Sequence, residues 1–193
     1  MTHRIIATLT LVAALALAAT LTATNANRNA AQMKAAELTK TRVARGEYLV
    51  GIGGCNDCHT PLKMTARGPE PDFSRRLSGH PEGLKMPPAP KPNGPWVWSG
   101  AGTNTAFAGP WGVSYARNLT PDPVTGIGIW SEAQFMKTIR SGRHWGVGRP
   151  ILPPMPWQNV AGLTDEDLRS VYAYLRTVPA VHNDVPDAVL AAQ

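Results

Sequence analysis

The sequence predicts a small all-α domain. Two stretches have helix patterns with capping residues at both ends, a third helical stretch runs into a pair of cysteines, and no convincing series of strands appears. A length of 193 residues fits one domain with extensions. Charged residues make up 17% of the chain and hydrophobic residues 43%, a globular composition that can form a sizeable core.

The clearest helix is expected between Ser131 and Gly142. Ser131 and Gln134 fit a capping box, in which the serine side chain accepts a hydrogen bond from the first turn. Trp130 and Phe135 have the spacing of a hydrophobic staple. Gly142 is a typical helix stop.

Another helix is expected from Thr164 to just before Pro179. Thr164 is a suitable N-cap, and the acidic residues 165–167 complement the helix dipole. Its apolar face is expected to contain Leu168, Val171, Tyr172 and Leu175. The first helix of the domain is expected in the run VARGEYLVGIGGC, with Val43, Gly46 and Val50 on one face.

Residues 61–115 are expected to form a long loop insertion rich in Pro, Gly and Trp. Nine prolines lie between residues 61 and 95, and proline disfavours both helix interiors and central strands. Trp96, Trp98 and Trp111 lie among glycines and small residues, so the loop is expected to be pinned by aromatic packing. A long ordered loop of this kind predicts a cover over an apolar ligand.

Both cysteines of the chain, Cys55 and Cys58, lie directly before His59 in the run GGCNDCHTP. Three chemistries use two close cysteines: a redox dithiol, half of a zinc site, or covalent attachment of haem. The adjacent histidine favours haem, because in C-x-x-C-H the thiols form thioethers and the imidazole can ligate the iron.

The other two interpretations need features that lie elsewhere. A zinc site would have to complete its shell with His80, His144 or His182, because there is no second pair of cysteines. A redox dithiol would be expected after a strand within a βαβ pattern, and neither appears.

The N-terminus has the pattern of an export signal. Arg4 precedes an uncharged run over residues 5–21, extendable to Ala23, and Thr24 and Ala26 fit a cleavage site after Ala26. An uncleaved anchor over residues 5–23 is the alternative. Residues 1–26 are therefore expected to be a signal peptide or an anchor, residues 27–41 a tether, and the domain is expected outside the cytoplasm.

The formal charge is +6, with an isoelectric point of about 9.7. Cleavage after Ala26 would remove Arg4 and leave about +5. A modest positive excess is usually a solvated surface, and it can also steer an acidic partner protein or an anionic membrane. No Lys/Arg-rich run with interleaved aromatic residues predicts nucleic-acid binding.

Three runs resemble the class I c-type cytochromes: RGEYLVGIGGCNDCHTP, ARNLTPDPVTGIGIWSEAQFMKTIRSGRH and PMPWQNVAGLTDEDLRSVYAYLRTVP. They are most similar to the cytochrome c proteins that serve bacterial periplasmic alcohol and aldehyde dehydrogenases. The resemblance covers residues 42–180 and leaves residues 181–193 as a C-terminal tail. Those dehydrogenase subunits often carry two or three C-x-x-C-H motifs, whereas this chain has one.

The resemblance implies a small class I cytochrome c fold of about three main helices around one covalent haem c. It implies a periplasmic electron carrier, not an enzyme, that takes electrons from a periplasmic dehydrogenase and passes them to another cytochrome or a terminal oxidase. The periplasm is also where bacterial haem attachment is expected in this family, so the export signal and the motif support each other.

The resemblance further implies a methionine as the second axial ligand of the iron. Met155 matches this position in ILPPMPW, where prolines on both sides restrict the backbone. Met86, in LKMPPAP, is the main rival, and Met64, His80 and His144 are the other candidates.

Two packing features also come with the resemblance. The N-terminal and C-terminal helices are expected to cross at a small residue, with Gly46 and Val50 against Val171, Tyr174 and Leu175. A backbone carbonyl is expected to orient His59 through its second ring nitrogen, with Pro69 or Pro71 as the nearest counterparts of the family's proline.

Two other functions remain alternatives. One is a haem-based sensor of small ligands, or a peroxidase-like enzyme, with an open sixth coordination position. The other is a thiol oxidoreductase that uses Cys55 and Cys58.

Overall fold

The structure is a computed structural model that describes residues 2–90 and 94–191, except for the side chains of residues 2–23 and 26. The chain divides into two units, Met1–Thr41 and Arg42–Gln193. The described backbone of the first unit is the N-terminal part of one long helix, α1. Among the residues searched, no helix is both long and apolar enough to cross a membrane. Apart from Thr24 and Asn25, the side chains of the expected signal or anchor lie outside the described part, so the choice between cleavage and anchoring stays a prediction.

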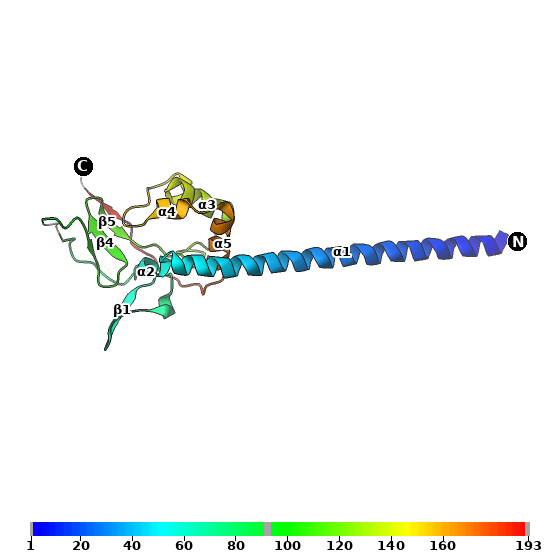
Figure 1. Cartoon of the computed structure of the whole chain (residues 1–193), viewed down its shortest axis with the longest axis horizontal. Coiled ribbons are helices and arrows are strands. Elements are labelled where there is room, and N and C mark those ends of the chain that lie inside the picture. The colour runs from blue at the N-terminus through cyan, green and yellow to red at the C-terminus, as the bar shows by residue number, and fades with distance from the viewer. Residues whose placement is uncertain (1, 91–93, 192–193) are drawn as a thin grey trace. The chain divides into compact units, whose positions relative to one another are not determined.

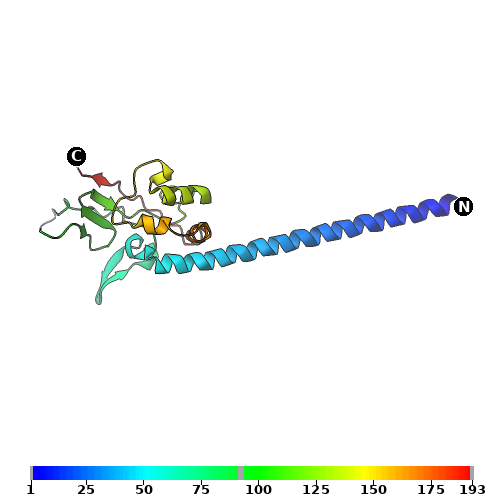
Figure 2. The ribbon, with the colours of Figure 1, turned by 45° about the horizontal axis from the view of Figure 1, so that its top comes forward.

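The second unit contains the end of α1, all the other helices and all the strands. The helices are α1 (Thr2–Ile52), α2 (Cys55–His59), α3 (Glu132–Ser141), α4 (Trp157–Ala161) and α5 (Asp165–Leu175), with short 3-10 turns at Phe73–Arg75 and His144–Gly146. The strands are β1 (Leu62–Thr65), β2 (Gly68–Pro71), β3 (Ser99–Gly100), β4 (Ala106–Gly109), β5 (Gly112–Tyr115) and β6 (Val189–Leu190). Figures 1 and 2 show α3, α4 and α5 grouped together in this unit, with the β4–β5 hairpin beside the C-terminus.

The all-α class predicted from the sequence is wrong. The described residues contain a two-stranded sheet, β1–β2, and a four-stranded sheet in the order β3–β4–β5–β6. Five of these six strands lie within residues 61–115, the segment expected to be an irregular loop, and β6 lies in the expected C-terminal tail.

The β1–β2 hairpin forms in spite of its prolines. Pro69 and Pro71 alternate along β2, opposite Met64 and Leu62 of β1. The N–H groups of every second residue in a strand point to the same side. A strand that pairs with only one neighbour can therefore lack N–H donors on its unpaired side. The prolines therefore exclude a central strand here but permit an outer one.

The β4–β5 hairpin turns at Pro110 and Trp111. Gly109 pairs with Gly112 at the base of this two-residue connection, and Gly112 has a φ of 101°, which glycine adopts without strain. Two short apolar runs around a two-residue turn are a hairpin signal, which the abundance of Gly, Pro and Trp obscured.

The capped helices follow the sequence prediction closely. Ser131 Oγ accepts a hydrogen bond from the Gln134 N–H at 3.1 Å, and α3 ends at Gly142 with a φ of 62°. Thr164 Oγ1 accepts from the Asp167 N–H at 3.1 Å at the start of α5. Each helix begins at the predicted cap because its side chain satisfies an N–H that has no partner within the helix.

The end of α1 packs against α5 at Gly46, as expected. A Cβ at Gly46 would lie 1.9 Å from the Ser170 carbonyl oxygen and 2.7 Å from Tyr174 Cβ, so only glycine permits this approach. The hydrophobic core around the crossing consists of Val50, Leu77, Ile127, Phe135, Ile139, Leu168, Val171, Tyr174, Leu175 and Val178.

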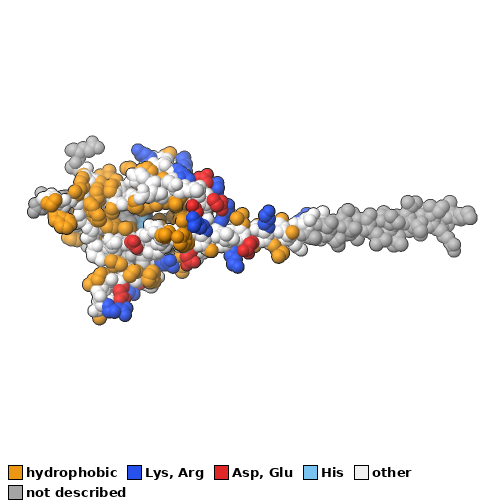
Figure 3. All heavy atoms as spheres, viewed as in Figure 1, with side chains coloured by type: hydrophobic (Ala, Val, Ile, Leu, Met, Phe, Trp, Pro, Cys, Tyr) orange, Lys and Arg blue, Asp and Glu red, His pale blue; other side chains and the backbone are white. Residues whose placement is uncertain are grey.

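Ion pairs join α1 to the first turn of α5. Arg42 Nε lies 2.6 Å from Glu166 Oε1, and Arg45 Nε lies 2.9 Å from Asp167 Oδ1. Charged side chains of both signs gather where the two helices meet (Figure 3). The hydrogen bonds from the two arginines lower the pKa of both carboxyl groups below their usual values.

These depressed pKa values predict a pH dependence. A carboxyl with a lowered pKa in the folded state stabilises the fold above its unfolded pKa, and this stabilisation is lost as the pH falls through the folded pKa. The wild-type domain is therefore expected to lose stability as the pH falls below about 4. The variant with Arg42→Gln and Arg45→Gln should show a flatter decline in Tm over that range. Equal slopes for both proteins in thermal melts at several pH values would contradict this prediction.

Candidate functional site

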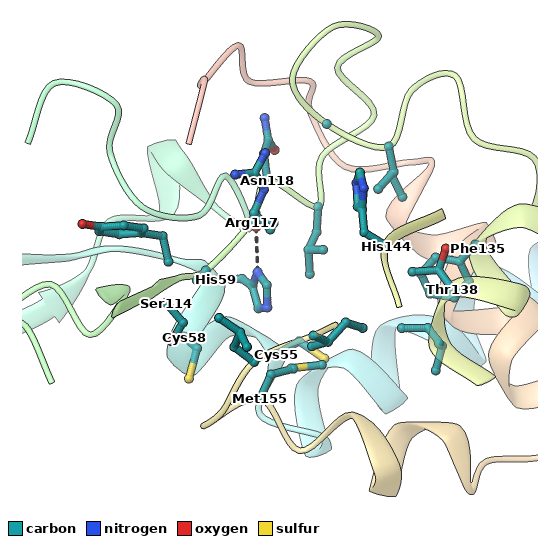
Figure 4. Close-up of a pocket in the computed structure, with 18 of the residues that line it drawn as sticks. Cys55, Cys58, His59, Ser114, Arg117, Asn118, Phe135, Thr138, His144 and Met155 are labelled. Atoms are coloured by element: carbon teal, nitrogen blue, oxygen red, sulfur yellow. Dashed lines mark hydrogen bonds between the residues drawn. The ribbon is translucent and has the colours of Figure 1, made fainter. Parts of the chain in front are cut away.

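A cavity of about 330 Å³ lies in the second unit, and the four predicted site residues all line it: Cys55, Cys58, His59 and Met155. The first three belong to α2, whereas Met155 comes from the segment before α4. Figure 4 shows these side chains together around the cavity. The volume falls within the range of roughly 300–1,000 Å³ that is typical of small-molecule and cofactor sites.

The rest of the cavity wall is mostly apolar. The hairpin β4–β5 contributes Phe107 and Tyr115, and the helices contribute Phe135, Ile139, Val171 and Leu175. Arg117 and Arg149 also line the cavity, and none of the described residues that line it is acidic. An apolar space with two thiols, one imidazole, one thioether and two positive charges fits a covalently bound haem with its two anionic propionates.

His59 is buried and has a fixed orientation. Its Nδ1 lies 2.7 Å from the carbonyl oxygen of Arg117 (Figure 4). A carbonyl can only accept a hydrogen bond, so Nδ1 carries the hydrogen. Burial lowers the pKa of His59, and the hydrogen bond to Arg117 opposes this shift only in part, so the ring is neutral at pH 7. Its Nε2 therefore keeps a free lone pair, as a metal ligand requires.

The carbonyl that orients His59 is not the one expected from the sequence. Pro69 and Pro71, the expected counterparts, lie in β2 of the hairpin, whereas Arg117 follows β5. The principle that a backbone carbonyl holds the ring is confirmed, but the residue is different because the segment after the motif folds into a hairpin.

The cysteines have the properties of weakly nucleophilic thiols. Burial raises the pKa of Cys55, and burial together with the nearby Asp57 raises the pKa of Cys58. Redox-active thiols have lowered pKa values, because the thiolate is the reactive form. This disfavours the thiol oxidoreductase interpretation.

A zinc site receives no support from the arrangement of the side chains. Among the residues with described side chains, no group of three or more His, Cys, Asp or Glu residues is placed so that it could hold a metal ion. His80 lies elsewhere, fully buried, with its Nδ1 2.9 Å from Thr105 Oγ1.

Met155 lies in a segment that is tied to the rest of the wall. The Ser114 hydroxyl of β5 donates a hydrogen bond to the Pro153 carbonyl at 2.7 Å, and the Trp157 N–H donates to the Met155 carbonyl at 2.9 Å. The other candidate methionine ligands lie outside the cavity wall. Met64 is 76% exposed on β1, and Met86 is half-buried in the segment between β2 and β3.

His144 is the one rival ligand that also lines the cavity. Its ring packs against Trp130 and Trp145, with centroids 5.6 Å and 6.1 Å away. Burial lowers the pKa of His144, and Arg149 adds to this shift. A second neutral imidazole therefore lies in the same wall as Met155.

The tryptophans expected to cover a ligand are not those that line the cavity. Trp96 and Trp98 are exposed in the segment just before β3, and Trp111 lies at the turn of the β4–β5 hairpin. Trp130 and Trp145 line the cavity instead. The expected cover was wrong because part of the loop folds into a sheet: Trp111 lies at its hairpin turn, and Trp96 and Trp98 lie just before its edge strand β3.

The polar wall residues Arg117, Asn118 and Arg149 were among those missed from the sequence. Arg117 and Asn118 lie two and three residues after the end of β5, in the run SYARN. A hairpin prediction for AFAGPWGVSY would have placed Arg117 and Asn118 just after the second strand of the hairpin.

No protein-family model matches the chain. The chain is 33% identical over 132 residues to the gluconate 2-dehydrogenase cytochrome c subunit of Pantoea cypripedii, which covers 68% of this chain and 22% of that protein. It is 29% identical over 157 residues to the fructose dehydrogenase cytochrome subunit of Gluconobacter japonicus, covering 81% of this chain and 25% of the relative. It is also 28% identical over 148 residues to the cytochrome c subunit of a quinone-dependent alcohol dehydrogenase of Gluconobacter oxydans, covering 75% of this chain and 24% of the relative.

The matches thus span about a quarter or less of the length of these relatives. Within this chain they cover most of its length. The resemblance that the sequence motifs indicate is therefore confirmed: the chain is a homologue of the cytochrome c subunits of bacterial dehydrogenases.

Proposed function

We propose that the chain is an electron-transfer protein that carries one covalently attached haem c in this cavity. One observation carries the proposal: the only two cysteines of the chain line the same apolar cavity as His59 and Met155. The cytochrome subunits among its relatives support the same function.

Four side chains would hold the haem. Cys55 and Cys58 would form the thioether bonds, and His59 Nε2 and the Met155 sulfur would be the axial ligands. Arg117 and Arg149 would face the propionate charges. When bound, haem supplies an iron that alternates between the ferric and ferrous states and so carries one electron.

The protein residues set the conditions for this redox change. The hydrogen bond from His59 Nδ1 to Arg117 fixes the ring and increases the basicity of Nε2. The apolar wall excludes water, which disfavours the extra charge of the ferric state, and a thioether ligand acts in the same direction. We therefore infer a relatively high reduction potential for the protein.

We further propose a periplasmic dehydrogenase as the electron donor and another cytochrome or a terminal oxidase as the acceptor. The names of the relatives support a dehydrogenase partner, and the N-terminal pattern of a charged residue before an apolar run supports export. In this scheme the chain has no substrate of its own, so it is not an enzyme.

A spectroscopic redox titration of the purified full chain tests this function. A six-coordinate low-spin haem that titrates reversibly as a one-electron couple, and does not bind carbon monoxide rapidly when reduced at neutral pH, is the expected result. High-spin ferric iron or rapid carbon monoxide binding would instead favour a sensor or a peroxidase-like enzyme with an open sixth position.

A further inference from the structure

The C-terminal segment, residues 181–190, runs back over the domain as a strap, although the sequence predicts only a tail here. The Asn118 side chain donates a hydrogen bond to the Val181 carbonyl at 2.8 Å, and the last two residues of the strap form β6, which pairs with β5. We call residues 181–190 the C-terminal strap.

Asn183 anchors the strap. It is fully buried, and its Nδ2 donates to the carbonyls of Ser78 and His80 at 2.7 and 2.8 Å. Its Oδ1 accepts from Arg75 Nη2 at 2.7 Å and from the Glu82 N–H at 3.0 Å. The amide thus uses both donors and both acceptor positions, so the strap is held in one register against residues 75–82.

The segment that Asn183 holds contacts the backbone of His59. The Gly79 N–H donates to the His59 carbonyl at 2.7 Å, and the His80 N–H donates to the Ala116 carbonyl at 2.9 Å. Asn183 therefore holds the segment whose backbone hydrogen-bonds to both His59 and Ala116, the residue before Arg117.

Arg117 joins the strap to the ring of His59. Its carbonyl accepts the hydrogen bond from His59 Nδ1, while its Nη1 donates to the carbonyls of Val185 and Pro186 at 2.7 and 3.1 Å. Pro186 and Ala188 themselves line the cavity. A single residue thus binds the strap with its side chain and the predicted iron ligand with its backbone.

We propose that the C-terminal strap is a positioning element for His59: by holding Arg117 and residues 78–80, it keeps the Arg117 carbonyl against His59 Nδ1 and so sets the basicity of the proximal ligand. This inference rests on the proposed function of the cavity. A strong hydrogen bond at Nδ1 makes Nε2 a better electron donor and favours ferric iron. Loosening the strap should therefore weaken that bond and raise the reduction potential.

The test compares two arginines that line the same cavity. Arg117→Met removes a positive charge and the link to the strap, whereas Arg149→Met removes the same charge, and no hydrogen bond from its side chain to the strap is among the described contacts. Both variants lose one positive charge, but Arg117 Nη1 also lies 3.7 Å from Asp187 Oδ1 of the strap, so its removal leaves that carboxylate without this partner. The comparison of Nδ1–H exchange rates, rather than of reduction potentials, therefore isolates the effect of the link.

The direct measurement is the hydrogen exchange rate of the His59 Nδ1–H in the reduced haem-loaded protein, followed by NMR. We expect Arg117→Met to exchange about five to ten times faster than the wild type, as the loss of one or two hydrogen bonds implies. Arg149→Met should exchange at the wild-type rate.

A milder variant guards against failure of Arg117→Met to fold. A chain that ends at Asp187 loses β6, whose residues are more than half exposed, but keeps the acceptors of Arg117. It should show a smaller increase in Nδ1–H exchange. Wild-type exchange in the haem-loaded Arg117→Met and truncated chains would overturn the role of the strap, whereas a wild type without covalent haem would refute the proposed function itself.

Discussion

Gly46→Val is expected to prevent the stable folding of the domain. The new Cβ would lie 1.9 Å from the carbonyl oxygen of Ser170 and 2.7 Å from Tyr174 Cβ, so α1 and α5 would have to separate. Both helices contribute to the core through residues such as Val50 and Leu175. We expect a loss of more than about 3 kcal/mol, because the overlap involves backbone and cannot be relieved by a rotamer change.

Gly51→Ala is the matched control in the same helix. A Cβ at Gly51 has no heavy atom within 4 Å, and alanine favours helix over glycine by up to about 1 kcal/mol. Urea denaturation followed by circular dichroism should therefore give an unchanged or higher midpoint for Gly51→Ala and a strongly reduced one for Gly46→Val. Similar midpoints for both variants would show that α1 does not cross α5 as described.

Met155→His is expected to keep a low-spin haem and to lower the reduction potential. Imidazole tolerates ferric iron better than a thioether does, so the ferric state gains stability. The fall should be on the order of 100–300 mV, within the roughly 0.8 V range that axial ligands cover. A spectroelectrochemical titration measures it, and the weak near-red band from thioether to ferric iron should disappear.

Two control variants test the rival ligands. Met86→Leu should leave both the band and the potential unchanged, because Met86 is outside the cavity wall. His144→Leu should also preserve the band, although His144 lines the cavity. Survival of the near-red band in Met155→His, or its loss in Met86→Leu, would mean that the wrong methionine was assigned.

The sequence predicted the helices well because their signals are local. The caps at Ser131 and Thr164 and the stop at Gly142 depend only on residues within one turn. The crossing at Gly46 came from the resemblance to cytochromes, and the structure places Gly46 against α5 as expected.

The strands could not be predicted with the same ease. The pairing of β6 with β5 joins residues far apart in the chain, and no local pattern specifies such a partner. The β1–β2 hairpin contains two prolines, and proline-rich composition by itself favours the prediction of a loop. The four-stranded sheet in turn placed Arg117, in place of Pro69 or Pro71, at the ring of His59.

The structure places Met155 in the wall of the same cavity as the C-x-x-C-H motif, and its role as an iron ligand stays a prediction. The predicted tryptophan cover was wrong, because it depended on how residues 61–115 fold. The tryptophans that line the cavity, Trp130 and Trp145, could not be identified without that fold.

The central claim is that Cys55, Cys58, His59 and Met155 hold one covalent haem. The most direct test is extraction of the purified full chain with acidified acetone, followed by the alkaline pyridine spectrum of the precipitated protein. We predict that the haem stays with the protein, at one haem per chain, with the spectrum of a haem joined through two thioether bonds. Extraction of all the haem into the solvent, or two reactive thiols in the purified chain, would contradict the account.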